Sequence, residues 1–267
     1  MTAKMLCAGI DIGSLTAEAV VLEDGRILGS EIMSVLPHPV DSAREVMGRV
    51  CARLGIRPSD LRYTVSTGYG RQMLQEEGLA QENLSEISCH GLGAHTVCPE
   101  TRTVVDIGGQ DAKVIKLTAS GELENFVMND KCAAGTGHFL EVMSRTLGVA
   151  LDELGPLSLG SRKPVEMSNR CTIYVETEVL HSLQRGVSRQ DVAAGINRAM
   201  AERVLALVRR VTPEREIMLT GGVAKNVAVK SELEKMLKVK MVSAAIDPQL
   251  IGAFGAAVFA QRKAGSR

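Results

Sequence analysis

Residues 104–111 read Val-Val-Asp-Ile-Gly-Gly-Gln-Asp and repeat the pattern of residues 8–14, Ala-Gly-Ile-Asp-Ile-Gly-Ser. In both stretches an apolar run typical of a buried strand ends at a glycine turn, and a second apolar run follows, which predicts a β-hairpin. Matches at four kinds of position indicate that this hairpin is duplicated within the chain. One offset of 95 residues relates the matching positions: Asp11 and Asp106, Gly13 and Gly108, Val20 and Ile115, Leu22 and Leu117.

The duplication predicts an α/β chain of two related subdomains that hold a polyphosphate between them. Each subdomain would place one carboxylate near a metal ion. We expect the first subdomain to span residues 1–98 and the second to span residues 99–249. An apolar, glycine-seeded helix at residues 250–264 is expected to pack back on the first subdomain.

The bulk composition excludes several classes of protein. The chain has 31 Lys+Arg and 31 Asp+Glu, so it lacks the net positive charge that would attract nucleic acid or an anionic membrane surface. Only 3% of the residues are aromatic, which argues against base-stacking platforms. The N-terminus lacks the pattern of a signal peptide, and the apolar run at residues 250–260 is too short to span a bilayer. We therefore expect a cytoplasmic protein with neither nucleic acid nor membrane as partner, whose 6 cysteines do not form structural disulfides.

Residues 129–137, Asn-Asp-Lys-Cys-Ala-Ala-Gly-Thr-Gly, place Cys132 ahead of a glycine turn that opens a helical pattern. The N-terminus of a helix presents unpaired amides and the positive end of the helix dipole, so it favours anions. We expect two anions here, the Cys132 thiolate and a phosphate along Gly135, Thr136 and Gly137.

A second cysteine, Cys171, stands in a similar place, before a predicted helix at residues 172–183. No Cys-x-x-Cys pair occurs, so spacing within one chain does not define a metal site. The remaining cysteines and the histidine that follows one of them are expected in the core: Cys7, Cys51, Cys89, Cys98 and His90.

A strand at residues 216–220 is followed by Gly221-Gly222 and by a helix with Asn226 near its start. A strand, a double glycine and a helix allow close backbone approach to a flat ligand such as a nucleoside.

The segments Asp-Ile-Gly-Ser, Asp-Ile-Gly-Gly-Gln-Asp, Gly-Thr-Gly and Leu-Thr-Gly-Gly-Val-Ala occur in this order. They resemble the phosphate-1, phosphate-2, connecting and adenosine motifs of the superfamily that includes actin, hexokinase and the heat-shock chaperone ATPases. The resemblance implies an actin-like (ribonuclease H-like) ATPase fold with a nucleotide cleft between two duplicated subdomains.

A more specific combination spans residues 67–71 (Thr-Gly-Tyr-Gly-Arg), 107–111, 129–137 and 171–172 (Cys-Thr). It resembles the activators of 2-hydroxyacyl-CoA dehydratases and the similar ATPase subunits of ATP-dependent benzoyl-CoA reductase. This resemblance covers essentially the whole chain.

The resemblance implies ATP and Mg²⁺ as ligands. Asp11 and Asp106 would manage Mg²⁺, and Gln110 would position the attacking water, by analogy with glutamines in other nucleotide hydrolases. Gly221, Gly222 and Asn226 would contact the nucleoside. The remaining positions would contact phosphate: Gly13, Ser14, Gly108, Gly109, Lys113, Gly135, Thr136 and Gly137.

The resemblance also implies a homodimer with one [4Fe–4S] cluster at its interface, ligated by Cys132 and Cys171 of each chain, which gives the four thiolates that such a cluster requires. A ferredoxin or flavodoxin would supply an electron, and ATP hydrolysis would drive its delivery to an iron–sulfur 2-hydroxyacyl-CoA dehydratase. Three alternatives stay open at this point. One is a subunit of a reductase acting on aromatic acyl-CoA, and another is a small-molecule kinase of the same fold. The third is a nucleotide-dependent assembly or scaffold protein, in which the cysteines would lie in the core.

One position departs from the duplication. Lys113 in the second hairpin corresponds to Glu18 in the first, where the activators tend to carry a lysine. The change bears on local phosphate or metal contacts, whereas a hairpin position that faces solvent would tolerate it.

Overall fold

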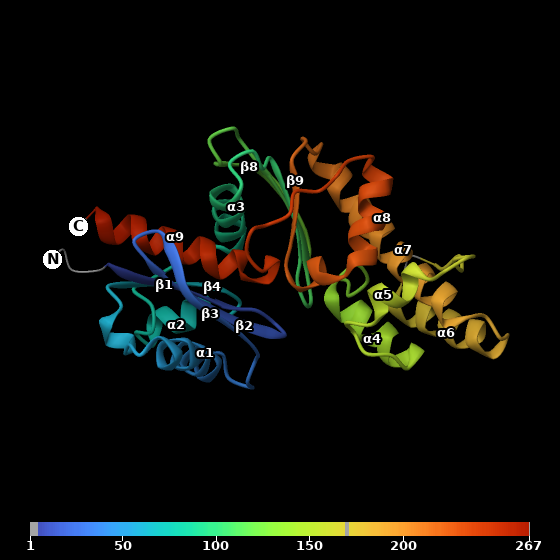
Figure 1. The fold of residues 1–267 in the computed structure, drawn as a ribbon, viewed down its shortest axis with the longest axis horizontal. Coiled ribbons are helices and arrows are strands. Elements are labelled where there is room, and N and C mark those ends of the chain that lie inside the picture. Colours follow the sequence, from blue (N-terminus) through green and yellow to red (C-terminus); the bar gives the residue numbers. More distant parts are fainter. Residues whose placement is uncertain (1–4, 169–170, 267) are drawn as a thin grey trace. The chain divides into compact units, whose positions relative to one another are not determined.

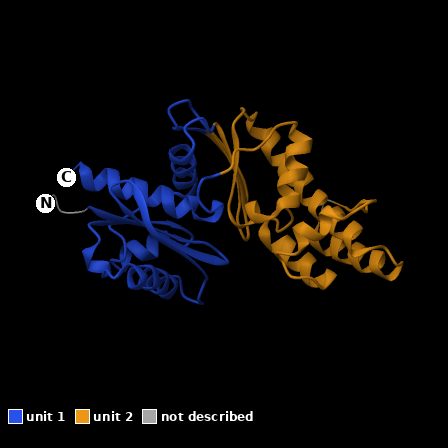
Figure 2. Cartoon of the chain, viewed as in Figure 1, with its two compact units in different colours: residues 1–101, 117–124, 244–267 blue, residues 102–116, 125–243 orange. Residues whose placement is uncertain are grey.

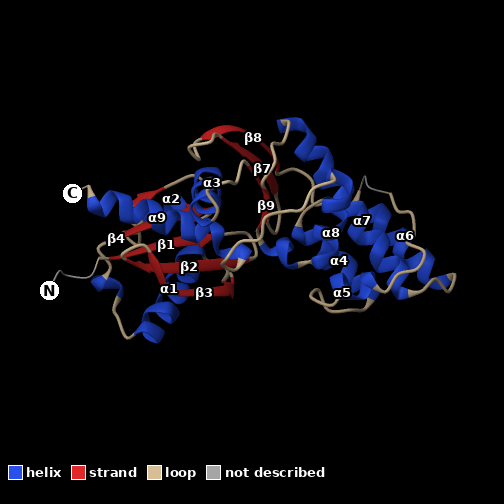
Figure 3. Ribbon diagram, turned by 45° about the horizontal axis from the view of Figure 1, so that its top comes forward, coloured by secondary structure: helices blue, strands red, loops and turns tan. Residues whose placement is uncertain are grey.

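The computed structural model describes residues 5–168 and 171–266. The chain divides into two compact units, coloured separately in Figure 2. Each unit combines helices with a β-sheet of its own (Figure 3), so the chain is an α/β protein as predicted. Unit 1 consists of the described residues up to Thr101, residues 117–124 and the residues from Ala244 onward, and unit 2 consists of residues 102–116 and 125–243.

The sheet of unit 1 has its strands in the order β3-β2-β1-β4-β5, of which Figure 3 labels the first four. β2 pairs antiparallel with β1 and β3, whereas β4 runs parallel to β1 and β5 runs parallel to β4. β1 and β2 are buried along almost their whole length. The strands are β1 (Leu6–Ile12), β2 (Thr16–Glu23), β3 (Arg26–Ser34), β4 (Tyr63–Gly68) and β5 (Glu82–Asn83).

Helices cover both faces of this sheet, which explains why its central strands are buried on both sides (Figure 1). α1 (Pro39–Leu54) and α2 (Arg71–Glu76) pack on one face, while α3 (Glu86–Val97) and α9 (Ile251–Gly265) pack on the other. α9 lies so close to β1 that a Cβ atom at Gly9 would come within 2.0 Å of a backbone oxygen of the helix. The small residues of the C-terminal helix therefore permit its close packing on the sheet.

The sheet of unit 2 has the order β8-β7-β6-β9, with β6 antiparallel to β7 and parallel to β9. One hydrophobic core joins this sheet to the helices of the unit, and the longest of these, α7, contributes buried side chains along most of its length. None of the helices in the described part of the chain has the length and hydropathy needed to cross a membrane.

The remaining bounds are as follows. The strands are β6 (Thr103–Ile107), β7 (Ala112–Leu117), β8 (Leu123–Asn129) and β9 (Ile217–Thr220). The helices are α4 (Gly137–Leu147), α5 (Leu154–Leu159), α6 (Thr172–Gln184), α7 (Arg189–Val208) and α8 (Val227–Leu237). Short 3-10 segments lie at Pro58–Asp60, Arg209–Val211, Gly222–Lys225 and Pro248–Leu250.

The two sheets share one topology, so the repeat in the sequence is a repeat in the structure. The hairpin β1–β2 corresponds to β6–β7, and the parallel neighbour β4 corresponds to β9. Asp11 lies opposite Glu18 in the first hairpin, and Asp106 lies opposite Lys113 in the second. These are the pairs that the offset of 95 residues relates.

Candidate functional site

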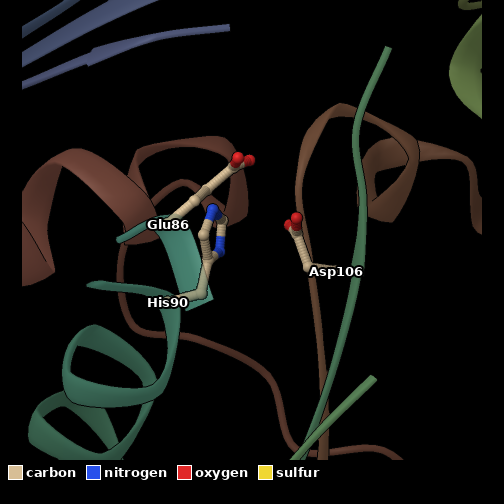
Figure 4. A group of neighbouring side chains, drawn as sticks. All are labelled: Glu86, His90 and Asp106. Carbon is tan, nitrogen blue, oxygen red and sulfur yellow. The ribbon is translucent and has the colours of Figure 1, made fainter. Parts of the chain in front are cut away.

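Asp106 lies near the end of β6 within a buried group of polar side chains, and Figure 4 shows its carboxylate projecting from the strand. The hydroxyl of Thr220 donates a hydrogen bond to Asp106 Oδ1 at 2.9 Å. Lys113 Nζ lies 3.5 Å from Asp106 Oδ2 and 2.6 Å from Asp111 Oδ1. All four side chains are buried, so the ammonium compensates two carboxylates that burial would otherwise penalise.

The glycine turn after β6 is joined by hydrogen bonds to the start of α4. The amide of Gly137 donates to the carbonyl of Gly108 at 2.8 Å, and the amide of His138 donates to the carbonyl of Gly109 at 2.8 Å. Two segments predicted to contact phosphate, the Gly108-Gly109 turn and residues 135–137, are therefore brought together. The first two amides of α4 are already engaged in this contact.

The other residues of these two turns differ in exposure. Thr136 is buried, and its hydroxyl donates to the carbonyl of Ala133 at 2.6 Å, which closes the turn before α4. Gly135 has φ +90°, a conformation that favours glycine. Gln110 is exposed at the tip of the hairpin. Its predicted role with the attacking water stays a proposal.

In the first hairpin, Asp11 is buried beside an imidazole. His90 Nε2 lies 3.9 Å from Asp11 Oδ2, and both side chains are buried. Glu86 and His90 project from the same side of α3, one turn apart (Figure 4). A Cβ atom at Gly252 would lie 2.2 Å from Asp11 Oδ2 and 2.8 Å from His90 Nε2, so α9 carries a glycine at this point. The sequence correctly predicted a buried His90 but did not indicate its proximity to Asp11.

The turns of the two hairpins are closed in the same way. The amide of Gly13 donates to the carbonyl of Thr16 at 2.9 Å, and the amide of Gly108 donates to the carbonyl of Asp111 at 3.0 Å. Ser14 is partly exposed in the first turn. The equivalence supports a common role for the two turns.

Position 18 does not face solvent, because Glu18 is only 4% exposed. Gln249 Nε2 donates a hydrogen bond to Glu18 Oε1 at 3.0 Å, and it also lies 3.0 Å from the hydroxyl oxygen of Thr16. The position is buried because helices cover both faces of the hairpin in unit 1. The difference between Lys113 in the second hairpin and Glu18 in the first therefore lies in the protein interior.

The repeat extends to the loops that follow β4 and β9. Thr67 lies opposite Asp11 in the parallel ladder, and Thr220 lies opposite Asp106. The next residue is a glycine with φ +80° or +82°. A Cβ atom on either glycine would lie 2.4 Å from a backbone oxygen of the neighbouring strand. In each unit the chain therefore comes close to that strand at a Thr-Gly pair, which is Thr67-Gly68 in unit 1 and Thr220-Gly221 in unit 2. The hairpin repeat does not reveal this correspondence, because the two Thr-Gly pairs are separated by an offset that differs from that of the hairpins.

Asn226, predicted to contact a nucleoside, begins α8. Its Oδ1 accepts hydrogen bonds from the amides of Ala228 and Val229, at 3.0 and 3.1 Å, which is the geometry of an N-cap. Its Nδ2 donates to Asn197 Oδ1 at 2.8 Å. The side chain is thus engaged within unit 2, and Gly222 beside it is exposed.

Cys132 is partly exposed and lies close to α7. Arg203 Nη2 donates a hydrogen bond to Cys132 Sγ at 3.3 Å, and Asn129 Nδ2 donates to the Cys132 carbonyl at 2.9 Å. Burial raises the pKa of the Cys132 thiol, but hydrogen bonds from Arg203 and from the Ala134 amide outweigh it, and the pKa is lowered overall. A lowered pKa favours the thiolate, which is the form that binds metals.

Cys171 is also partly exposed and forms the N-cap of α6. α4 and α6 pack against each other, and the hydroxyl of Thr146 donates to Glu176 Oε1 at 3.1 Å between them. Both cysteines therefore belong to one packed body, unit 2.

The segment before Cys171 is held by α7. The Asp191 carboxylate accepts hydrogen bonds from the hydroxyls of Ser161 and Ser188, at 2.6 and 2.8 Å. It also accepts them from the amides of Arg162 and Lys163, at 3.0 and 2.8 Å. The hydrogen bond from Ser161 contributes most, and together these bonds hold the pKa of Asp191 well below its usual range.

The other cysteines differ from Cys132 and Cys171. All six have free thiols. Burial raises the pKa of each of three buried thiols, and that of Cys89 reaches about 12. Cys98 is partly exposed and its thiol donates to Glu100 at 3.2 Å, so the prediction of a core position is wrong for Cys98. It is confirmed for Cys7, Cys51 and Cys89.

The donor set of one chain fits half of a four-thiolate site. Among the described residues, neither Cys132 nor Cys171 belongs to a group of three or more His, Cys, Asp or Glu with donor atoms within 4.8 Å of one another. Unit 2 carries two partly exposed thiols, Cys132 and Cys171, and two copies of the chain would supply the four that a shared cluster requires.

Known proteins resemble this chain along most of its length. The BadF/BadG/BcrA/BcrD ATPase family matches this chain over residues 8–260. The (R)-2-hydroxyglutaryl-CoA dehydratase activating ATPase of Acidaminococcus fermentans is 41% identical, covering 96% of this chain and 97% of the relative. One of the benzoyl-CoA reductase subunits of Thauera aromatica is 31% identical, covering 95% and 92%.

Solved structures agree with the sequence comparison. The activator of the 2-hydroxyisocaproyl-CoA dehydratase from Clostridium difficile, solved with bound ADPNP, has a TM-score of 0.93 and 39% identity, covering 98% of this chain and 96% of that one. A glucokinase from Streptomyces griseus has a TM-score of 0.62 at 14% identity, covering 96% and 99%, and so shares the fold alone. The predicted actin-like fold is thus confirmed, and the chain belongs to the BadF/BadG/BcrA/BcrD ATPase family.

Proposed function

We propose that the chain is an ATP-dependent activator of a 2-hydroxyacyl-CoA dehydratase. The single observation that carries the proposal is the pairing, within unit 2, of a glycine-lined phosphate hairpin with two partly exposed cysteines at helix starts. The similarity to activators of such dehydratases supports it.

ATP would contact the two duplicated turns through backbone amides. Asp11 and Asp106 end equivalent strands and are suited to orient Mg²⁺ with its waters. Because the side chain of Asn226 is engaged in capping α8, contact with the nucleoside falls to the backbone of Gly221 and the exposed Gly222. Gln110 is exposed at its hairpin tip, where it is free to turn toward an attacking water.

Cys132 and Cys171 of two chains would together hold one [4Fe–4S] cluster, whose chemistry when bound is one-electron transfer at low potential. The residues of this chain prepare the ligands for it. Arg203 and the amide of Ala134 stabilise the Cys132 thiolate, and Cys171 is held at the N-cap of α6. The protein would act as a homodimer, receiving electrons from a ferredoxin or flavodoxin and delivering them to the iron–sulfur dehydratase.

The experiment is anaerobic purification followed by iron and sulfide analysis. We expect a brown dimer with about four irons per two chains, lost in Cys132→Ala and in Cys171→Ala. Cys98→Ala is the matched control, since this thiol is also partly exposed but lies in unit 1, and it should retain the iron. A colourless wild-type protein that still hydrolyses ATP would contradict the proposal and favour a kinase.

A reductase subunit is the second candidate, because the benzoyl-CoA reductase subunit also resembles the whole chain. Its identity of 31% is lower than the 41% of the dehydratase activator, which places it second. Purification at native expression levels separates the two candidates. An activator should elute as a homodimer, whereas a reductase subunit should elute with chains of different sequence.

A further inference from the structure

Arg203 contacts the sulfur of Cys132 from the middle of the core helix of unit 2. It lies on α7, and its Nη2 donates to Cys132 Sγ at 3.3 Å. A Cβ atom at Gly135 would lie 3.3 Å from the Cβ of Arg203, so the glycine turn after Cys132 packs directly on the stem of the arginine. The arginine is therefore fixed at both its stem and its charged end.

The contact borders a cavity of about 350 Å³ inside unit 2. Its lining includes Asn129, Cys132 and Arg203, together with the acid Glu202 and the exposed Arg210, and Arg203 is the residue whose guanidinium contacts the sulfur. A hydrogen bond in such a partly enclosed place is screened less than one at the open surface.

The second cysteine has a different environment. In residues 5–168 and 171–266, no side-chain donor bonds to Cys171 Sγ, and Cys171 forms the N-cap of α6. In a symmetric dimer the two arginines would therefore act on the two Cys132 sulfurs and not on the Cys171 sulfurs.

We propose that Arg203 is a positioning residue that keeps a hydrogen bond on Cys132 Sγ and thereby raises the reduction potential of the bound cluster. The inference rests on the proposed function. A donor and a positive charge at a ligand sulfur stabilise the reduced state, which carries more negative charge than the oxidised state. The planar guanidinium holds this geometry better than an ammonium does.

The test is a redox titration of the anaerobically reconstituted dimer, followed by EPR, with iron and sulfide analysis of each sample. Arg203→Met should shift the midpoint potential to a more negative value at full iron occupancy, and Arg203→Lys should give a smaller shift. Arg189→Met is the control on the same helix, since Arg189 is exposed at the first residue of α7 and does not line the cavity, and its potential should equal that of the wild type.

The outcomes separate the two proposals. If Arg203→Met folds but loses iron that the control retains, the arginine is needed to hold the ligand, and the shift in Arg203→Lys then measures its effect. A wild-type potential in Arg203→Met at full occupancy would overturn this inference alone. A wild-type protein that binds no iron would overturn it together with the proposed function.

Discussion

Glu18 and Lys113 occupy the same position in two copies of one hairpin, and both are buried although their charges are opposite. Glu18 lies opposite Asp11, so two acids are neighbours in unit 1. Lys113 lies opposite Asp106 and forms ion pairs with it and with Asp111. The duplicated hairpins thus have the same backbone and different electrostatics.

Lys113→Met should destabilise unit 2 strongly. The substitution leaves Asp106 and Asp111 buried without their cation, and breaking a buried pair in this way costs about 3–5 kcal/mol. Urea denaturation measures the loss. Lys240→Met is the control, because Lys240 is 91% exposed in its pair with Glu234 and should cost about 1 kcal/mol or less. Equal losses in the two variants would contradict the assignment.

Glu18→Gln should tighten ATP binding. If the first hairpin contacts phosphate, the buried carboxylate repels the nucleotide, and the isosteric amide removes that repulsion while keeping an acceptor for Gln249. We expect the Kd for ATP, measured by calorimetry, to fall about threefold to tenfold. Glu45→Gln, an exposed change on α1, should leave it unchanged. Weaker binding in Glu18→Gln would mean that the carboxylate assists the nucleotide.

Gly221→Ala should lower the free energy of unfolding by about 1–3 kcal/mol. Gly221 has φ +82° and ψ 176°, a region that other residues rarely adopt, and the added Cβ would meet the Ile107 carbonyl oxygen at 2.4 Å. Gly48→Ala is the matched comparison, since it lies exposed in α1 with nothing within 4 Å of the added atom. It should stabilise the protein by about 0.5–1 kcal/mol. Opposite signs in thermal unfolding are the expected result.

Asp191 should make the stability of unit 2 depend on pH in acid. Its pKa is lowered in the folded state, so its contribution is present above the unfolded value of about 3.9 and is lost as the pH falls toward the folded value. Asp191→Asn should be less stable at pH 7 and less sensitive to pH below about 4. Hydrogen exchange should show faster exchange of the Arg162 and Lys163 amides in the variant. Unchanged exchange there would count against the role of Asp191.

Alkylation of the native protein without iron should separate the cysteines into two classes. A thiol with a pKa of about 12, such as Cys89, is ionised in about one molecule in 10⁴ at pH 8. Iodoacetamide at pH 8 should label Cys132, Cys171 and Cys98 in the folded chain, and Cys89 only after denaturation. Peptide mass spectrometry gives the rates, and fast native labelling of Cys89 would contradict its burial.

The architecture could be predicted from the sequence because its signals are local. The apolar runs and the glycine turns at Asp11–Gly13 and Asp106–Gly108 define two hairpins, and their common offset implies a common topology. Close packing of α9 follows from its small residues. These patterns depend on residues that are neighbours along the chain.

The surroundings of the functional side chains could not be predicted in this way. Arg203 and Cys132 are 71 positions apart, and Gln249 and Glu18 are 231 apart, so no short motif contains either contact. The burial of Glu18 was missed because periodicity alone does not show that helices cover both faces of a strand. The contact of His90 with Asp11 depends on the docking of α3 in the same manner.

α7 carries Asn197 and Arg203 six positions apart, which is about 9 Å along a helix. Asn197 accepts a hydrogen bond from Asn226 at the start of α8, and Arg203 donates one to Cys132. The start of α8 and the Cys132 thiol are thus both hydrogen-bonded to the same helix, α7. A displacement of the first turn of α8 would either break the hydrogen bond between Asn226 and Asn197 or shift α7. A shift of α7 would move the Arg203 guanidinium at the Cys132 sulfur.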